Sequence, residues 1–166
     1  HNCLVGSEMC IRDRYITNSV QEEVGLRGAQ MITERIKPDV AIVTDVCHDT
    51  QTPMINKIKQ GDLFCGKGPV LTYGPAVQNN LLNLIIDTAD INKIPFQRAA
   101  ASRATGTDTD AFAYSTGGVA SALISLPLRY MHTTVESVHK NDVENVIKLI
   151  YYALLKIKDG HDFRYI

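Results

Sequence analysis

Two adjacent glutamates, Glu22 and Glu23, are the residues whose types and spacing point most directly to chemistry. They end a short apolar stretch and precede a Gly-Leu-Arg-Gly run. Adjacent carboxylates repel each other and are costly to bury, so a chain that places both where a strand meets a helix usually has a cation there to share. One carboxylate can then bind a metal ion while the other transfers a proton. The pair therefore predicts a metal-dependent site.

Two later apolar runs also end in residues of types that bind metals. The run of residues 40–44 is followed by Asp45, and the run of residues 124–131 is followed by His132. Carboxylate oxygens and imidazole nitrogens are both common ligands of divalent cations. Glu, Asp and His at the ends of three separate runs are therefore predicted to form one site.

The composition restricts the classes of function that are open to the chain. Its 166 residues suffice for one domain, and an apolar fraction of 45% supports a globular core. A formal charge of −1 gives no basic face for nucleic acid or a membrane surface, and no apolar run is long enough to span a bilayer. We therefore expect no nucleic-acid or membrane partner, and a small molecule or a peptide as the ligand.

Four cysteines, Cys3, Cys10, Cys47 and Cys65, show neither a CxxC pair nor a zinc-finger spacing. The N-terminus lacks the apolar core of a signal peptide. This pattern indicates a cytoplasmic protein whose thiols are free.

The elements that would position these residues alternate between strands and helices. The sequence predicts strands over residues 15–20, 40–46, 94–101 and 119–126, a helix over 25–36, and a loop over 61–75. Gly74 and Pro75 are expected to start a helix that ends near Ile91. This order predicts an α/β fold, in which a largely parallel sheet is flanked by helices in layers.

A final helix is predicted from Asn141, because Asn141 to Glu144 resembles a capping box. Its buried stripe is expected to contain Val143, Val146, Ile147, Ile150 and Leu154. Residues 1–14 do not fit the scheme, since they lack periodicity and Val5 to Asp13 resembles a translated sequencing-library adapter. We interpret residues 1–14 as a leader foreign to the gene, and expect the natural protein to be longer at its N-terminus.

Five motifs then occur in a fixed order along residues 15–158. They are Ser19 to Ala29 (SVQEEVGLRGA), Thr44-Asp45-Val46 with His48-Asp49, Cys65-Gly66-Lys67-Gly68-Pro69, Gly106-Thr107-Asp108, and Pro127 to Glu136 (PLRYMHTTVE). In these motifs the chain closely resembles the C-terminal part of metallopeptidase family forty-two. The resemblance implies that residues 15–166 are the C-terminal part of a catalytic domain of dimetal aminopeptidases, which assemble into tetrahedral dodecamers.

The resemblance also implies a role for each residue of the predicted site. Glu22 is the general base, Glu23 and Asp45 bind one metal ion, and His132 binds the second. The cofactors are two divalent ions, zinc or cobalt. A water that bridges two such ions has its pKa lowered from 15.7 toward about 7, and a nearby carboxylate that is not a ligand takes its proton.

The chain departs from the family pattern in its ligand set. The second metal of the family also needs an early histidine and an aspartate that bridges both ions, and neither is found before Glu22. Asp13 lies too close to Glu22, and within the leader, to replace that aspartate. The fragment by itself is therefore expected to be inactive or nearly so, and the dodecamer is expected of the full-length protein.

Other polar residues near these motifs have less specific interpretations. His48 and Asp49 are assigned to the surroundings of the metal site, where side chains orient the ligands. The Gly66-Lys67-Gly68 loop lacks the Walker spacing and is at most a wall of the substrate cleft. Asp108 and Asp110 are placed near the cleft, although a solvated loop explains them nearly as well. His139 and Lys140 are predicted to be surface residues.

Three functions remain open on the sequence. The leading hypothesis is an aminopeptidase that removes N-terminal residues from short peptides. A dimetal deacylase or amidase would use the same activated water but would not require a free amine. A non-catalytic partial domain is the third possibility, because part of the ligand set is missing.

Overall fold

A parallel pair of strands forms the centre of the fold. In the computed structural model, which describes residues 13–115 and 117–163, β1 (Val40–His48) pairs with β4 (Ala120–Arg129) from Val40 opposite Ala120 to His48 opposite Leu128. β1 is rich in β-branched residues and β4 in apolar residues, which suit a sheet that is covered on both faces. Because the strands are parallel, their carboxyl ends lie at one edge of the sheet, and the segments that follow them start there.

Shorter strands complete a mixed sheet. The order is β1-β4-β2-β3, with β2 (Val70–Tyr73) parallel to β3 (Gln97–Ala100) and antiparallel to β4. The two-residue strand β5 (Ser137–Val138) pairs antiparallel with the end of β4. The predicted layered α/β class is confirmed, and its sheet contains both parallel and antiparallel pairs.

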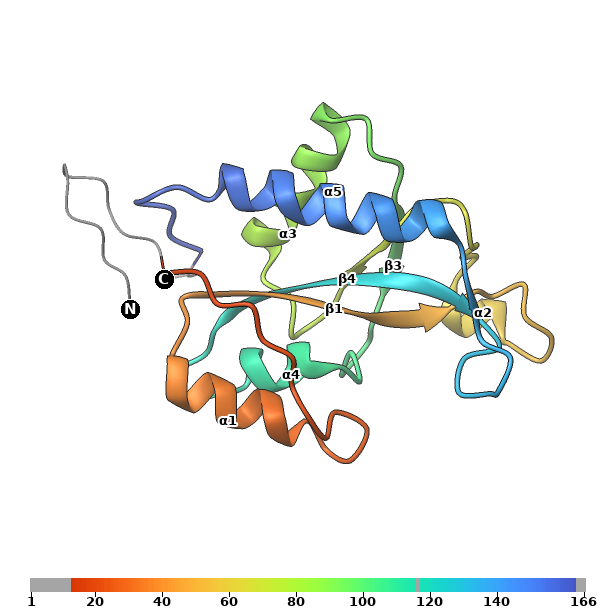
Figure 1. The fold of residues 1–166 in the computed structure, drawn as a ribbon, viewed down its shortest axis with the longest axis horizontal. Coiled ribbons are helices and arrows are strands. Elements are labelled where there is room, and N and C mark those ends of the chain that lie inside the picture. Colours follow the sequence, from red (N-terminus) through yellow and green to blue (C-terminus); the bar gives the residue numbers. More distant parts are fainter. Residues whose placement is uncertain (1–12, 116, 164–166) are drawn as a thin grey trace.

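Helices cover both faces of this sheet (Figure 1). Helices α3 (Asn79–Ile91) and α5 (Lys140–Lys156) lie on one side, and α1 (Arg27–Ile36) and α4 (Asp108–Ala113) lie on the other. The short helix α2 (Lys57–Gln60) lies beyond the end of β1. None of the helices in the described part of the chain is long and apolar enough to cross a bilayer.

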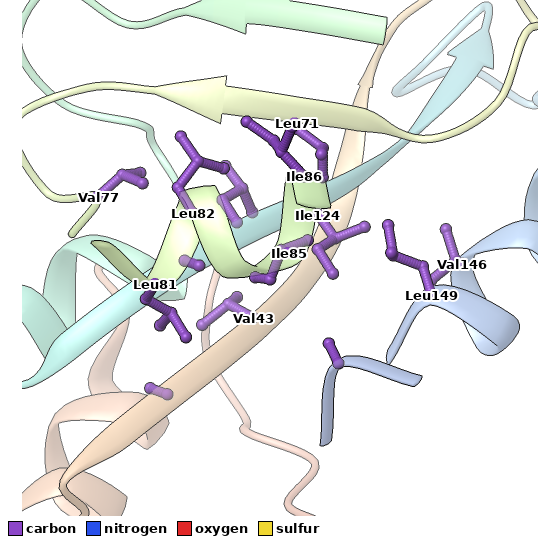
Figure 2. Packing of buried hydrophobic residues seen from close by; sticks show 14 of the residues in the cluster. Val43, Leu71, Val77, Leu81, Leu82, Ile85, Ile86, Ile124, Val146 and Leu149 are labelled. Carbon is purple, nitrogen blue, oxygen red and sulfur yellow. The ribbon is translucent and has the colours of Figure 1, made fainter. Parts of the chain in front are cut away.

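The apolar core lies between the sheet and the α3–α5 layer (Figure 2). Side chains of Leu81, Leu82 and Ile85 are fully buried on α3, and Leu149 and Ala153 are fully buried on α5. They pack in one cluster with the inward residues of the strands, including Val43, Leu71 and Ile124. This core holds β1 and β4 in place. It therefore fixes the end of the sheet from which β1 and β4 lead toward the predicted site residues.

Several predicted elements are confirmed, and four details are wrong. The helix and strands near residues 25–36, 40–46, 94–101 and 119–126 form as α1, β1, β3 and β4. Residues 15–20 do not form a strand, because the described chain offers them no partner strand. The predicted loop 61–75 contains β2, and α3 starts at Asn79, capped by the Gln78 side chain, which accepts a hydrogen bond from Leu81 N at 2.7 Å.

The fourth correction concerns α5. The helix starts at Lys140, and Nδ1 of His139 accepts a hydrogen bond from Asn141 N at 3.2 Å, so the predicted capping box is not used. Ile147 is 63% exposed, and Leu149 and Ala153 occupy the buried stripe instead. His139 and Lys140 are exposed, as predicted.

Asp142, which lies inside the predicted capping box, has another structural role. Its side chain is completely buried, and its two oxygens accept hydrogen bonds from Gly66 N at 2.6 Å and Gly68 N at 2.8 Å. Gly68 could not be replaced here, since its φ is +95° and a Cβ would lie 2.0 Å from the Pro95 carbonyl oxygen. The Gly66-Lys67-Gly68 loop is therefore a fixed connection to the first turn of α5.

Replacing Asp142 with Ala should reduce the free energy of unfolding by about 3 kcal/mol, because two buried N–H groups lose a charged acceptor. Urea denaturation of the chain measures this change. Glu144→Ala is the matched control, since its side chain is partly exposed on the same helix and its ion pair with Lys140 spans 3.8 Å. The control should change stability by less than about 0.5 kcal/mol. Equal effects of the two substitutions would contradict the assigned role.

Candidate metal centre

Two of the predicted metal ligands meet although they are far apart in sequence. Oε1 of Glu23 lies 3.1 Å from Nε2 of His132. Glu23 lies in the turn before α1, and His132 follows the end of β4 by three residues. Both side chains are mostly exposed, at 73% for Glu23 and 64% for His132. The structure therefore places a carboxylate and an imidazole side by side at the surface, where an ion from solution can reach them.

The segment that carries the glutamates adopts an unusual backbone. Gln21 and Leu26 have positive φ values of 61° and 57°, a region that side chains other than glycine rarely occupy. Gly28 donates a hydrogen bond to the Val20 carbonyl at 2.9 Å, and a Cβ on Gly28 would lie 2.4 Å from that oxygen. The glycine in the sequence motif is therefore required for the glutamate turn to pack on α1.

The loop that carries His132 is also held in a strained conformation. Tyr130 and His132 have φ values of 56° and 63°. The Glu136 carboxylate accepts a hydrogen bond from the His132 backbone N–H, and the Thr133 hydroxyl donates to the Tyr130 carbonyl at 2.6 Å. Strained residues of this kind persist only where their surroundings fix them, and they cluster at functional sites.

Asp45, the third predicted ligand, lies in β1 opposite Ser125 of β4. Its side chain is partly buried, and Oδ1 accepts a hydrogen bond from Val46 N at 2.7 Å. Burial raises the pKa of the Asp45 carboxyl, and the charges of Asp108 and Glu23 raise it further, against the lowering effects of the Val46 N–H and His132. Asp45 is thus within electrostatic range of the Glu23–His132 pair, although no direct contact joins them.

Glu22, the predicted general base, belongs to the same group of charges. Its side chain is partly exposed. Partial burial raises the pKa of the Glu22 carboxyl, as do the charges of Asp45, Glu23 and Asp108, while His132 opposes the shift. A carboxylate with a raised pKa holds a proton more readily, which is the property that a general base needs.

Asp108 is the acidic residue whose place the sequence left open. It is the first residue of α4 and only 8% exposed, so the solvated-loop interpretation is wrong. Oδ2 accepts a hydrogen bond from the Ser19 hydroxyl, whereas Oδ1 is buried and has no hydrogen-bond partner in residues 13–115 and 117–163. Asp110 is equally buried, but its oxygens accept hydrogen bonds from Thr105 N and Gly106 N and hold the preceding loop.

The residues present fit a divalent cation only in part. In the described ranges, no three His, Cys, Asp or Glu side chains come close enough together to hold a metal ion. Carboxylate and imidazole groups are nevertheless donors of the types that divalent metal ions bind. Neighbouring carboxylates raise the pKa of Glu22 and of Asp45, and one buried oxygen of Asp108 lacks a hydrogen-bond partner among the described residues. A bound cation would reduce the energetic cost of both the charge repulsion and the unpaired oxygen.

His48 and Asp49 lie beside this site and do not join it. Asp49 is buried and accepts hydrogen bonds from Gln51 N at 2.7 Å and Cys65 N at 3.1 Å. Burial alone would raise the pKa of Asp49, but these hydrogen bonds outweigh it and lower the pKa. Cys47 and Cys65 are free thiols, as predicted, while Cys3 and Cys10 lie outside the described residues.

A helix-covered mixed sheet that carries Glu, Asp and His side chains on neighbouring segments is compatible with the class of metal-dependent hydrolases. A profile of the M42 glutamyl aminopeptidase family matches residues 5–149. The chain therefore belongs to this peptidase family. The match starts inside residues 1–14, and the interpretation of that segment as a foreign leader stays a prediction.

Known proteins agree with this assignment. The chain is 40% identical over 146 residues to a lysyl aminopeptidase of Pyrococcus furiosus, covering 88% of this chain and 41% of that relative. A TET aminopeptidase of a marine sediment Thaumarchaeota archaeon superposes with a TM-score of 0.78 at 33% identity, over 85% of this chain and 40% of that one. The TET1 peptidase of Pyrococcus horikoshii, which can assemble into a tetrahedron or a large octahedral shell, gives a TM-score of 0.62 at 31% identity, with coverage of 82% and 38%. The chain thus spans about two fifths of the length of these relatives.

Replacing Asp45 with Asn should stabilise the metal-free chain at pH 7. The raised pKa means that folding disfavours the ionised carboxyl, so the native chain loses stability as the pH rises above about 3.8 toward the folded pKa. Asn removes the charge and can still accept from Val46 N. The gain should stay within about 1 kcal/mol because water screens a partly exposed group, and should vanish below the unfolded pKa. Urea denaturation across this pH range measures the change, and Asp87→Asn is the exposed control. If Asp45→Asn destabilised the chain at pH 7, the assigned pKa shift of Asp45 would be wrong.

Proposed function

We propose that the full-length protein containing this segment is a metal-dependent aminopeptidase that removes N-terminal residues from peptides. The observation that carries the proposal is the contact between Glu23 and His132, next to Glu22 and Asp45, in a chain of the M42 family. The relatives named above are aminopeptidases, which supports the reaction class.

Each side chain has a distinct part in this proposal. Glu23, Asp45 and His132 would hold two divalent ions, zinc or cobalt, together with ligands from the rest of the protein. When bound, the ions would supply an activated water and polarise the substrate carbonyl. Glu22 takes a proton from the attacking water and passes it to the leaving amine, for which its raised pKa suits it.

We further propose that the full-length protein is a cytoplasmic homo-oligomer, with a dodecamer as the expected form. The assembly of the Pyrococcus horikoshii relative supports the oligomer. The second candidate function is a non-catalytic partial domain. It is favoured by one observation, namely that the described residues bring no three ligand side chains together.

The decisive experiment compares peptides with free and acetylated N-termini as substrates of the purified full-length protein, with zinc or cobalt added. An aminopeptidase should hydrolyse the free peptide and leave the acetylated one intact, because the metal site holds the free amine. Equal hydrolysis of both would identify a deacylase or amidase instead. No hydrolysis of either, with metal bound, would favour the non-catalytic candidate.

Replacing Glu22 with Gln in the same protein should leave the metal content unchanged and reduce kcat by about a hundredfold or more, because Gln cannot accept the proton. Metal analysis and turnover are measured on the same preparation. Glu23→Gln is the comparison, since removing a ligand should lower both metal content and rate. If Glu22→Gln also lost metal, Glu22 would be a ligand and its assigned role would be wrong.

A further inference from the structure

The segment that carries Glu22 and Glu23 needs an anchor outside itself. Residues 13–26 form no regular helix or strand, and Gln21 and Leu26 both have left-handed backbone angles. The turn has internal hydrogen bonds, from Gly25 N at 3.1 Å and Leu26 N at 3.0 Å to the Glu22 carbonyl. The hydrogen bond from Gly28 N to the Val20 carbonyl holds the turn against α1. These bonds shape the turn and hold it to α1, and Glu23 also contacts His132 after β4, but none of them joins the turn directly to α4 or to β1, where Asp45 lies.

Asp108 provides a link between this segment and the rest of the site. Its side chain is buried at the start of α4, which packs against α1, β1 and β4. The Thr107 hydroxyl caps this helix, and Asp110 holds the loop before it, so Asp108 sits on a fixed support. Its Oδ2 accepts the hydrogen bond of Ser19, three residues before Glu22.

A buried aspartate at position 108 costs free energy unless its carboxylate has a role in the site. Asp108 lies close enough to Asp45 and Glu22 for its charge to disfavour theirs. Its Oδ1 is buried without a partner among the described residues. A side chain that served packing alone would need neither a charge nor an oxygen that lacks a hydrogen-bond partner. The carboxylate therefore faces the group of charges and holds Ser19 at the same time.

We propose that Asp108 is a positioning residue, which holds Ser19 and thereby fixes the strained Glu22–Glu23 turn over Asp45. The proposal deepens the proposed function, since the turn matters because it carries the base and one metal ligand. It adds a link between the Gly-Thr-Asp motif and the Glu-Glu motif that acts through a single hydrogen bond.

Nitrogen-15 relaxation of the chain tests this link without requiring metal or activity. In the wild type, the amides of residues 20–26 should show order parameters near about 0.85, the value of rigid backbone. Ser19→Ala and Asp108→Ala should each reduce them toward about 0.6 or below, and leave α3 and α5 unchanged. The double variant should show no further loss, and Asp108→Asn, which keeps an acceptor oxygen, should restore most of the order. Asp87→Ala on the exposed face of α3 is the control.

A flexible turn in the wild type, or one that stays rigid in Ser19→Ala, would overturn the proposal. Equal loosening of α5 would also overturn it, because that shows a general loss of structure. A double variant whose effects add would overturn it as well, because Ser19 and Asp108 would then act independently. If Asp108→Ala does not fold, Ser19→Ala decides, since the Ser19 side chain is only partly buried. If the relaxation experiment contradicted the role of Asp108, the aminopeptidase proposal would be unaffected. If the full-length protein hydrolysed no peptide, the link between Asp108 and Ser19 would be unaffected.

Discussion

Repulsion between carboxylates is the constraint on which the rest of the site depends. Burial and the neighbouring charges of Glu23 and Asp108 raise the pKa of both the Glu22 and the Asp45 carboxyl, and His132 opposes these shifts. A fold that keeps such groups together must hold them by stronger forces elsewhere. The buried β1–β4 pair and the apolar layer of α3 and α5 supply these forces, because burial of their large side chains stabilises the chain far more than the charges destabilise it.

Backbone strain is also concentrated near the site, where four of the seven non-glycine residues with positive φ in the described chain lie. Gln21, Leu26, Tyr130 and His132 all have positive φ values, and they flank or include the predicted site residues. A regular strand or helix would point consecutive side chains apart, at fixed angles. The irregular turns instead allow Glu23 and His132 to approach each other from two different segments. The fold thus combines rigid strands with short strained turns at their ends.

The sequence predicted the parts of the fold that depend on local patterns. Helix α1, strand β1 and the convergence of Glu23 with His132 follow from periodicity and from the family motifs. The failures depend on long-range contacts. Residues 15–20 are β-branched but have no partner strand, and β2 was hidden because it is short and follows a glycine-rich loop. Asp108 also accepts a hydrogen bond from Ser19, eighty-nine positions away, which no local pattern reveals.

The parallel pairing of β1 with β4 also has a consequence for how the chain folds. Val40 pairs with Ala120, and the residues between them form two further strands and three helices. Closing so large a loop is slow, because its entropy cost precedes the contacts that reward it. Asp45 and His132 cannot come within electrostatic range of each other until that pairing is complete. A cation would therefore find its ligands together only in the native state, and its binding would stabilise that state by mass action instead of guiding the earlier steps of folding.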